Sequence, residues 1–236
     1  METRNSGVIL SGWKLPSMIV VSLILSEIIL RFSNTWGFVS YFVLVSGVLI
    51  SLSKLEELDD FNKLSIVLMI LPVLRILELF LNFGGFSKVV IESYLFLFLV
   101  VFYSFKFKIE VGYNKKGIGF LPLIVLLGIF FGILGNQLFN FDKNILILAI
   151  LPVVVFSEEI LFRGMIQNLF NKRQGLFFAI LISSALYGVF SLSFGFSISV
   201  FFFFMSLISG LIYGFVRNIY LAFFFSFIVQ LILFVF

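Results

Sequence analysis

Long runs of apolar residues, separated by short polar stretches, repeat along the whole of this 236-residue chain. An apolar run of roughly 17–25 residues is long enough to cross a bilayer as a helix. Nine runs have about this length, at residues 15–32, 36–53, 64–82, 89–106, 118–136, 145–170, 176–194, 197–216 and 219–236. The pattern predicts an all-α, polytopic membrane helical bundle of nine transmembrane helices, or of eight if the second or the last run is re-entrant.

The composition supports a membrane protein. The chain is 61% hydrophobic and 12% charged, with a mean hydropathy of +1.21, whereas about a quarter of a soluble domain is charged. The formal net charge is only +4 and no basic block with interleaved aromatic residues is present, so we expect contact with the lipid bilayer and no nucleic-acid partner. The chain has no Cys and no His. This excludes thiolate and imidazole ligands, a Cys nucleophile and a His general base, and predicts neither a metal nor a cofactor.

The distribution of Lys and Arg predicts the orientation, because cytoplasmic loops are enriched in these residues. With the amino terminus inside, eleven of them fall in inner segments and three in outer segments. The inner group is Arg4, Lys14, Lys54, Lys63, Lys106, Lys108, Lys115, Lys116, Lys172, Arg173 and Arg217; the outer group is Arg31, Lys88 and Lys143. We therefore expect a cytoplasmic amino terminus, in the cell (plasma) membrane.

Ionisable residues inside membrane helices are costly and by default suggest a function. Four acidic residues have a basic residue three or four positions away, which could neutralise them as a local ion pair. The predicted pairs are Glu27–Arg31, Arg75–Glu78, Lys88–Glu92 and Glu159–Arg163. Glu158 has no such neighbour. A buried carboxylate without a local partner is a candidate general base where water can reach it.

Small residues and prolines predict features of the helix packing. Glycines or serines spaced by four, as at Gly128 and Gly132, allow two helix backbones to approach closely. The other examples are Ser184 with Gly188, and Ser206 with Gly210 and Gly214. Pro72 and Pro152 lie inside apolar runs, where we expect them to kink the helices. At Pro152 the freed backbone groups would help to form a polar pocket near Glu158.

The stretch around Glu158 resembles a known sequence motif. Glu158, Glu159 and Arg163 form Glu-Glu-x-x-x-Arg on one predicted membrane helix, followed by Gly164. This looks like the first motif of the CAAX prenyl endopeptidase and bacteriocin-processing (CPBP, also called Abi) membrane proteins. The resemblance covers about 118–236, which we separate as a CPBP-like core from the N-terminal helices of 1–117 within one integrated membrane domain.

The two later motifs of that family are incomplete here. The family has an aromatic-x-x-x-His motif on the next helix, where this chain has Tyr187 and Ser191. Two helices further on it has His-x-x-x-Asn or His-x-x-x-Asp, where this chain has Ser226 and Gln230. Counted from the predicted cytoplasmic helix ends at ~1.5 Å per residue, Glu158 lies at a depth of roughly 18–20 Å, Ser191 at roughly 22 Å and Gln230 at roughly 17 Å. These similar depths predict a shared pocket.

The resemblance implies roles for these positions. In the family, the first Glu activates water for peptide cleavage, one His assists it, and the second His with the Asn stabilises the oxyanion. Ser191 and Ser226 replace both histidines, and a hydroxyl cannot exchange protons near neutral pH as an imidazole does. The loss of one oxyanion donor costs about two to three decades in rate. The loss of an acid–base partner costs about two to four.

The leading interpretation is a catalytically degenerate pseudoprotease whose cavity binds or positions a membrane or cell-envelope protein partner, as in the lysostaphin-resistance-like branch it resembles. The alternative is an active intramembrane CAAX-type endopeptidase with Glu158 as general base and a peptide substrate. A small-solute carrier could also use a buried carboxylate, but the sequence shows no inverted repeat or pair of broken helices.

Overall fold

A computed structural model describes residues 6–52, 60–80, 86–113, 117–139, 143 and 145–236. The described residues form helices and connecting segments and contain no β-strand, as the sequence predicts. The chain separates into two compact units, Met1–Leu81 and Asn82–Phe236, which we describe in turn. The second unit contains the whole of the predicted core, 118–236, together with the helix before it. The division predicted at residue 117 rests on sequence chemistry and stays a prediction.

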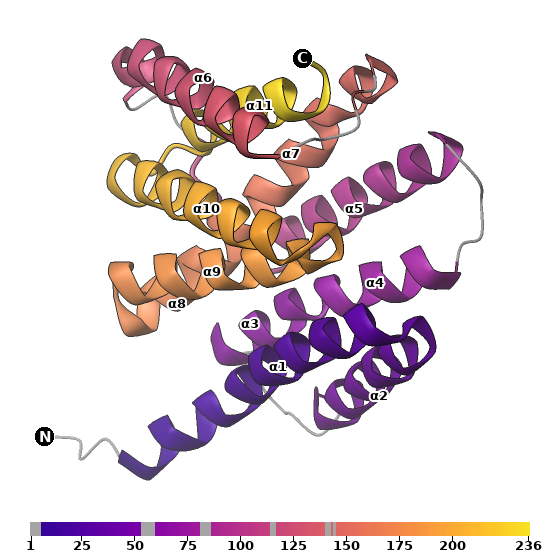
Figure 1. The fold of residues 1–236 in the computed structure, drawn as a ribbon. Coiled ribbons are helices and arrows are strands. Elements are labelled where there is room, and N and C mark those ends of the chain that lie inside the picture. Colours follow the sequence, from indigo (N-terminus) through magenta and orange to yellow (C-terminus); the bar gives the residue numbers. More distant parts are fainter. Residues whose placement is uncertain (1–5, 53–59, 81–85, 114–116, 140–142, 144) are drawn as a thin grey trace, which may run out of the picture. The chain divides into compact units, whose positions relative to one another are not determined.

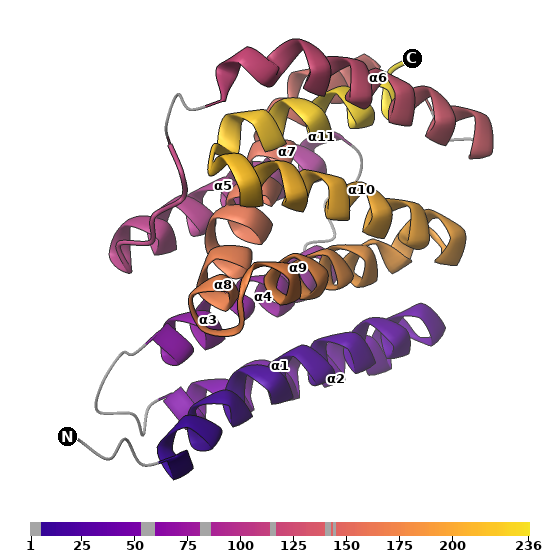
Figure 2. The same cartoon turned by 90° about the vertical axis from the view of Figure 1, so that its left-hand side faces the viewer.

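The first unit consists of α1 (Ser6–Phe32), α2 (Asn34–Leu52), α3 (Asp60–Leu68) and α4 (Ile70–Phe80). α1 packs along α2 and against α3, and α2 packs against α4 (Figures 1 and 2). The predicted span 64–82 is therefore not one helix, because the chain breaks between α3 and α4 at Met69. Pro72, in the first turn of α4, has no N–H to donate to the carbonyl of Leu68, which accounts for the break.

A buried arginine links α1 to α4. The Nε atom of Arg75 lies 2.7 Å from Oε1 of Glu27, and its Nη1 atom lies 2.5 Å from Oε2 of Glu78. The predicted Arg75–Glu78 pair is thus present, but the predicted Glu27–Arg31 pair is wrong: Arg31 is exposed, and Glu27 turns to an arginine 48 residues away. A tertiary partner replaces the local one because Glu27 faces the interior of the unit. The predicted partner of Glu92, Lys88, has a side chain outside the described residues.

The second unit is built from eleven helical segments among its described residues. They are α5 (Phe86–Lys106), η1 (Ile118–Phe120), α6 (Leu121–Leu138), η2 (Ile145–Ala149), α7 (Leu151–Glu159), η3 (Ile160–Gln167), α8 (Asn168–Gln174), α9 (Leu176–Phe190), η4 (Ser191–Phe194), α10 (Phe196–Val216) and α11 (Ile219–Phe234). α6 packs along α11, and α9 packs along α10 (Figures 1 and 2). α7 packs against both α5 and α11, so it lies inside the unit.

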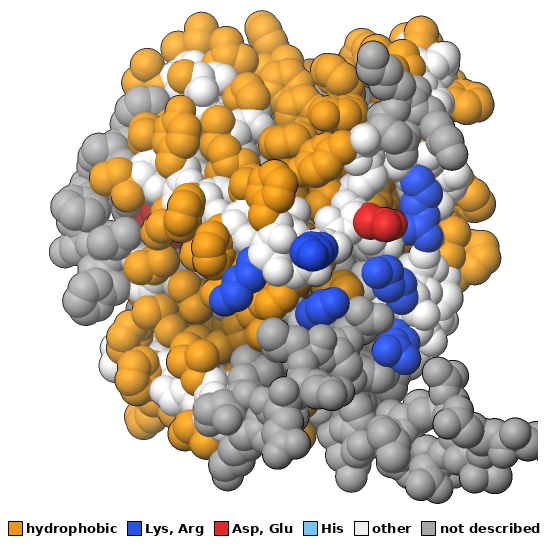
Figure 3. Space-filling model, turned by 180° about the vertical axis from the view of Figure 1, so that it is seen from behind, with side chains coloured by type: hydrophobic (Ala, Val, Ile, Leu, Met, Phe, Trp, Pro, Cys, Tyr) orange, Lys and Arg blue, Asp and Glu red, His pale blue; other side chains and the backbone are white. Residues whose placement is uncertain are grey.

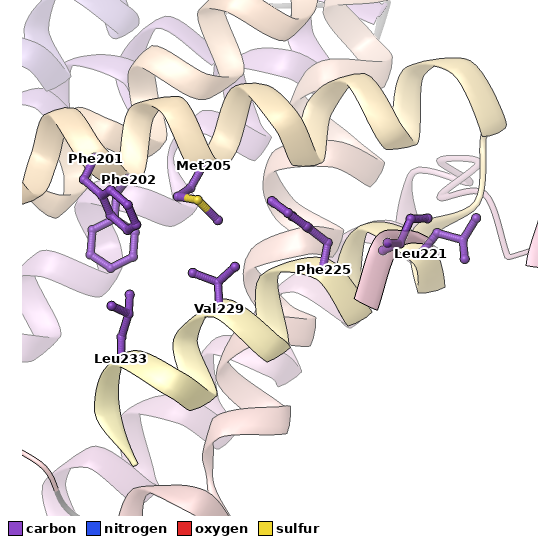
Figure 4. Packing of buried hydrophobic residues seen from close by; sticks show 8 residues of the cluster. Phe201, Phe202, Met205, Leu221, Phe225, Val229 and Leu233 are labelled. Carbon is purple, nitrogen blue, oxygen red and sulfur yellow. The ribbon is translucent and has the colours of Figure 1, made fainter. Parts of the chain in front are cut away.

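The core of the second unit lies between α6, α10 and α11. Figure 4 shows side chains of α10 and α11 that face one another, among them Phe202, Met205, Phe225 and Val229. Small residues bring the backbones together as predicted: a Cβ atom placed on Gly132 would lie 2.8 Å from Ile232 of α11. A Cβ atom on Gly188 of α9 would likewise lie 2.8 Å from Phe203 of α10. These glycines permit the close packing that holds the site helices together.

The predicted span 145–170 is a series of short segments. It begins as the 3₁₀-helix η2, continues as α7, widens into the π-helix η3, and returns to an α-helix in α8. The kink predicted at Pro152 is absent. Pro152 instead occupies the first turn of α7, where no hydrogen-bonded N–H is needed. The irregular part is η3, and π-turns inside helices are frequent at functional sites.

Five helices among the described residues are long and apolar enough to cross a membrane. They are Leu15–Phe32, Val89–Lys106, Ile118–Leu138, Leu176–Phe194 and Phe196–Val216, and two shorter apolar helices are Asn34–Ile50 and Ile219–Phe234. These seven match predicted runs; the other two predicted runs are the broken ones. Figure 3 shows a face covered largely by hydrophobic side chains, on which Lys and Arg side chains gather in one area.

One end of the second unit carries exposed basic residues on several helices. We call it the basic end and define it by Lys106, Lys108, Lys172, Arg173 and Arg217, all exposed. Hydrogen bonds join its segments: Arg217 Nη1 donates to Asn168 Oδ1 at 2.9 Å, and Asn168 Nδ2 donates to the carbonyl of Glu110 at 2.7 Å. The ends of α5 and α10 and the start of α8 therefore meet at one level.

Replacing Arg75 with Ala should destabilise the protein strongly, because it leaves the carboxylate of Glu27 buried without its cation. The loss of one partner of a buried ion pair costs about 3–5 kcal/mol. Thermal unfolding in detergent should therefore show a much lower midpoint for Arg75→Ala than for Arg31→Ala, which removes an exposed arginine from the same unit. Equal midpoints for the two variants would contradict this account of the pair.

Candidate functional site

Glu158 is held by two uncharged side chains from other helices. It lies in the last turn of α7, and its Oε2 atom accepts hydrogen bonds from the Tyr187 hydroxyl at 3.0 Å and from Gln230 Nε2 at 2.9 Å. Gln230 Nε2 also lies 3.0 Å from the Tyr187 hydroxyl oxygen. α7, α9 and α11 thus each contribute one member of a closed triangle. Glu158 has no local partner, as the sequence indicates, but it has two tertiary partners.

The two serines predicted to stand at the family's histidine positions are engaged elsewhere. Ser191 Oγ donates to the backbone carbonyl of Tyr187 at 2.9 Å. Ser226 Oγ donates to Glu159 Oε1 at 2.6 Å. Among the described residues, neither hydroxyl bonds to Glu158. The structure therefore brings Glu158, Ser191 and Gln230 to one place, and directs Ser226 to the neighbouring carboxylate.

Glu158, Ser191 and Gln230 line a cavity of about 590 Å³ inside the second unit. Tyr187 also borders it, and the rest of the lining is apolar. The apolar lining residues are Val89, Ile147, Ile150, Leu151, Val154, Phe194, Phe202 and Phe234. This volume lies within the range of about 300–1,000 Å³ that is usual for small-molecule sites, and a few convergent polar groups in an apolar pocket are typical of them.

Glu159 and Arg163 form a separate, fully buried polar network. Arg163 Nε lies 3.5 Å from Glu159 Oε2, so the predicted ion pair is present. The Arg163 guanidinium also donates to Ser183 Oγ at 3.0 Å, to the carbonyl of Ser206 at 2.7 Å and to the Ser206 hydroxyl. Ser209 Oγ donates to Glu159 Oε2 at 2.8 Å. The network ties η3 to α9, α10 and α11.

The π-helix η3 contains Arg163 and a second buried polar residue, Gln167. Gln167, one turn after Arg163, donates from Nε2 to the carbonyl of Gly210 at 3.0 Å. A Cβ atom on Gly210 would lie 3.2 Å from Gln167 Oε1 and 3.4 Å from Arg163 Nη1, so the absence of a side chain there makes room for both. Gly164 packs directly on Val111, where a Cβ atom would lie 2.4 Å from Cγ1.

A very small cavity of about 10 Å³ borders the Glu159–Arg163 network, and its polar lining includes Glu159, Arg163, Ser226 and Gln230. A cavity needs about 10–15 Å³ to hold a single water molecule. The predicted residues thus divide into two sites: Glu158, Ser191 and Gln230 at the large cavity, and Glu159, Arg163 and Ser226 around the small one. Gln230 touches both.

Sequence reasoning missed the polar partners of Glu159 and Arg163. Ser183, Ser209 and Gln167 were not singled out, and Ser206 was assigned to helix packing alone. A signal was present, because these polar residues interrupt otherwise apolar helices at spacings of three or four. A serine in a membrane helix usually serves only close helix packing, however, and the spacing alone does not identify a hydrogen-bond acceptor or donor for it.

Comparison with family models matches residues 140–232 to "Type II CAAX prenyl endopeptidase Rce1-like". The matched part contains all the site residues from Glu158 to Gln230. The match covers less than half of the chain, and it shows that this segment is similar to CPBP-family endopeptidases. Comparison with curated proteins and with solved structures gave no match. The CPBP assignment confirms the predicted resemblance and, with the long apolar helices, makes this chain a helical integral membrane protein.

Arg163→Ala should destabilise the CPBP segment, because it strands Glu159 in a site only 4% exposed. We expect a cost of about 3–5 kcal/mol, seen as a lower unfolding midpoint in detergent. Arg173→Ala is the matched control, since Arg173 is exposed at the basic end. If both variants unfold at the same temperature, the network does not support the fold as described.

The chain should retain no stoichiometric zinc after purification and washing with a chelator. Structural and catalytic zinc sites use Cys and His with carboxylates, and this chain has neither Cys nor His. No group of three or more metal-ligating acidic side chains occurs in the part of the chain that the structure describes. Elemental analysis that finds about one zinc per chain would contradict this expectation.

Proposed function

We propose that this protein is a CPBP-family membrane protein without protease activity, whose cavity binds or positions a partner from the membrane or the cell envelope. The single observation that carries the proposal is the environment of Glu158. Its two hydrogen-bond partners, Tyr187 and Gln230, are both uncharged, and Ser191 beside it is bonded to a backbone carbonyl.

Peptide hydrolysis needs a group that takes a proton from water and a group that returns one to the leaving amine. Glu158 could accept a proton, but an amide side chain cannot pass one on, and the tyrosine and serine hydroxyls titrate far above neutral pH. The oxyanion donor is also weakened, because Ser226 donates to Glu159 rather than into the large cavity. Losing both functions together costs about four to seven decades in rate.

The proposed orientation has the amino terminus in the cytoplasm and the protein in the plasma membrane. Five exposed basic residues from three separate parts of the second unit gather at the basic end. Inner segments of membrane proteins are enriched in Lys and Arg, so the basic end faces the cytoplasm in this proposal.

The second candidate is an active endopeptidase that uses Glu158 as general base. The observation in its favour is the size of the cavity at Glu158, about 590 Å³, which leaves room for a substrate next to the carboxylate. A protease would also need a proton donor for the leaving group, and among the described residues that line this cavity only Tyr187 and Ser191 carry a hydroxyl.

The two candidates differ in peptide cleavage by the purified chain. We expect native protein and Glu158→Gln protein to cleave a farnesylated CAAX peptide at the same background rate, because no proton transfer depends on Glu158. Glu158→Gln conserves size while removing the base. Glu110→Gln, at an exposed position, controls for the loss of an acidic residue. A native rate that exceeds the Glu158→Gln rate by two decades or more would establish the protease instead.

The double variant Ser191→His with Ser226→His tests the reason for inactivity. It returns two imidazoles to the positions where the family has them. We expect at most weak cleavage of the same peptide, above the native background. This gain should vanish when Glu158→Gln is added, because the restored reaction needs the carboxylate. A gain that survives in the triple variant would mean that the cleavage comes from another site or from a contaminant.

A further inference from the structure

The large cavity lies at the end of the second unit opposite the basic end. On α11 it is lined by Gln230 and Phe234, in the last two turns. The first residue of that helix, Ile219, donates its N–H to the carbonyl of Gly112 beside the basic end, at 3.1 Å. On α5 the lining residue is Val89, in the first turn, whereas Lys106 ends the helix. Both helices thus run from one end to the other.

α9 and η4 place their lining residues at the same end of the second unit. Tyr187 lies near the end of α9 and Phe194 in η4 after it, while α9 begins at Leu176. Leu176 packs against Gly214, in the last turn of α10, so the start of α9 is at the basic end. Phe194 is 57% exposed and Val89 44% exposed. The mouth of the cavity is therefore on the side away from the basic end.

The chemistry of the cavity is that of an apolar pocket with one acidic acceptor. Eight of its twelve lining residues are aliphatic or Phe, and none is Lys or Arg. Glu158 contributes the carboxylate. Its Oε2 atom already accepts two hydrogen bonds, and its Oε1 atom accepts none from the described residues. Oε1 is not among the buried side-chain atoms that lack a partner, so it is accessible, and a donor from a ligand in the cavity could reach it.

We infer that this cavity binds a single-chain amphiphile that ends in a protonated amine, and that the ligand enters from the face of the second unit opposite the basic end. The apolar chain occupies the apolar walls, and the ammonium group donates to Glu158 Oε1. The inference rests on the proposed function in one respect: a cavity that holds its ligand without cleaving it can serve as a stable binding site.

Charge complementarity favours an amine over other end groups on the same apolar ligand. A carboxylate-ended chain would set a second negative charge beside Glu158, with no Lys or Arg in the lining to compensate for it. A chain that ends in a hydroxyl could donate one hydrogen bond but brings no charge. Charge-assisted hydrogen bonds are about twice as strong as neutral ones. The expected order of affinity is therefore amine, then alcohol, then carboxylate.

The ligand class is tested by calorimetric titration of the full chain in nanodiscs of zwitterionic lipid, with empty nanodiscs subtracted. Octylamine, octanol and octanoate share one chain and differ in the end group. We expect octylamine to bind about tenfold or more tightly than octanol, and octanoate not to bind measurably. Glu158→Gln should abolish the preference for the amine, and Glu110→Gln should leave it unchanged. Octanoate binding as tightly as octylamine would overturn the inference.

A second variant locates the ligand even if Glu158→Gln folds poorly. Val154 lines the cavity, and Val154→Phe should fill part of it and weaken octylamine and octanol binding alike. Val43→Phe, at an exposed position of α2 in the first unit, is the matched control and should change neither. Unchanged binding in a folded Val154→Phe protein would place the ligand elsewhere and overturn the inference. This result is independent of the peptide-cleavage assay, which tests the proposed function.

The face of entry is tested by labelling single cysteines, because the native chain has none. Phe194→Cys marks the cavity mouth and Lys172→Cys marks the basic end. We expect a membrane-impermeant maleimide to label Phe194→Cys on intact cells and Lys172→Cys only in inverted vesicles, with octylamine protecting Phe194→Cys. If Lys172→Cys is labelled on intact cells and Phe194→Cys only in inverted vesicles, the inference stands and the proposed orientation is overturned. Labelling of both positions from the same side would overturn the inference.

Discussion

A charged group inside a membrane protein has to be neutralised by other parts of the same protein, and this constraint organises the second unit. Arg163 is 1% exposed and Glu159 4% exposed. Their ion pair is completed by hydroxyls from α9, α10 and α11 and by a carbonyl from α10. Each of these helices must sit at a fixed height and rotation for the network to close. The network therefore sets the positions of the three helices that also border the large cavity.

The same constraint explains the different environments of two adjacent carboxylates. Glu159 points into the network and meets a cation, whereas Glu158, one residue earlier, meets only Tyr187 and Gln230. Neighbouring residues on a helix lie about 100° apart around its axis, so the two side chains necessarily face different surroundings. One carboxylate stabilises the fold. The other lines a cavity, where a ligand can complete its hydrogen bonds.

Much of this arrangement can be predicted from the sequence, because helices in a membrane require long apolar runs. The runs identify most helices, and the motif at Glu158 identifies the family. The failures concern tertiary contacts. Arg75 replaces Arg31 as the partner of Glu27, since a side chain in the interior pairs with the nearest buried charge regardless of sequence distance. The π-helix η3 was also missed, because local periodicity does not reveal a turn that is set by the partners of Arg163 and Gln167.

The site itself shows why residue types carry more information than residue positions. Ser191 and Ser226 stand where the motif spacing predicts the family histidines, and equal spacing would suggest equal roles. Their hydroxyls instead bond to the Tyr187 carbonyl and to Glu159. A serine side chain ends at its γ oxygen, one bond from Cβ, whereas an imidazole extends well beyond it. A serine at either position therefore supplies neither the proton exchange nor the reach of an imidazole. Glu158 stands as an acceptor in a largely apolar pocket.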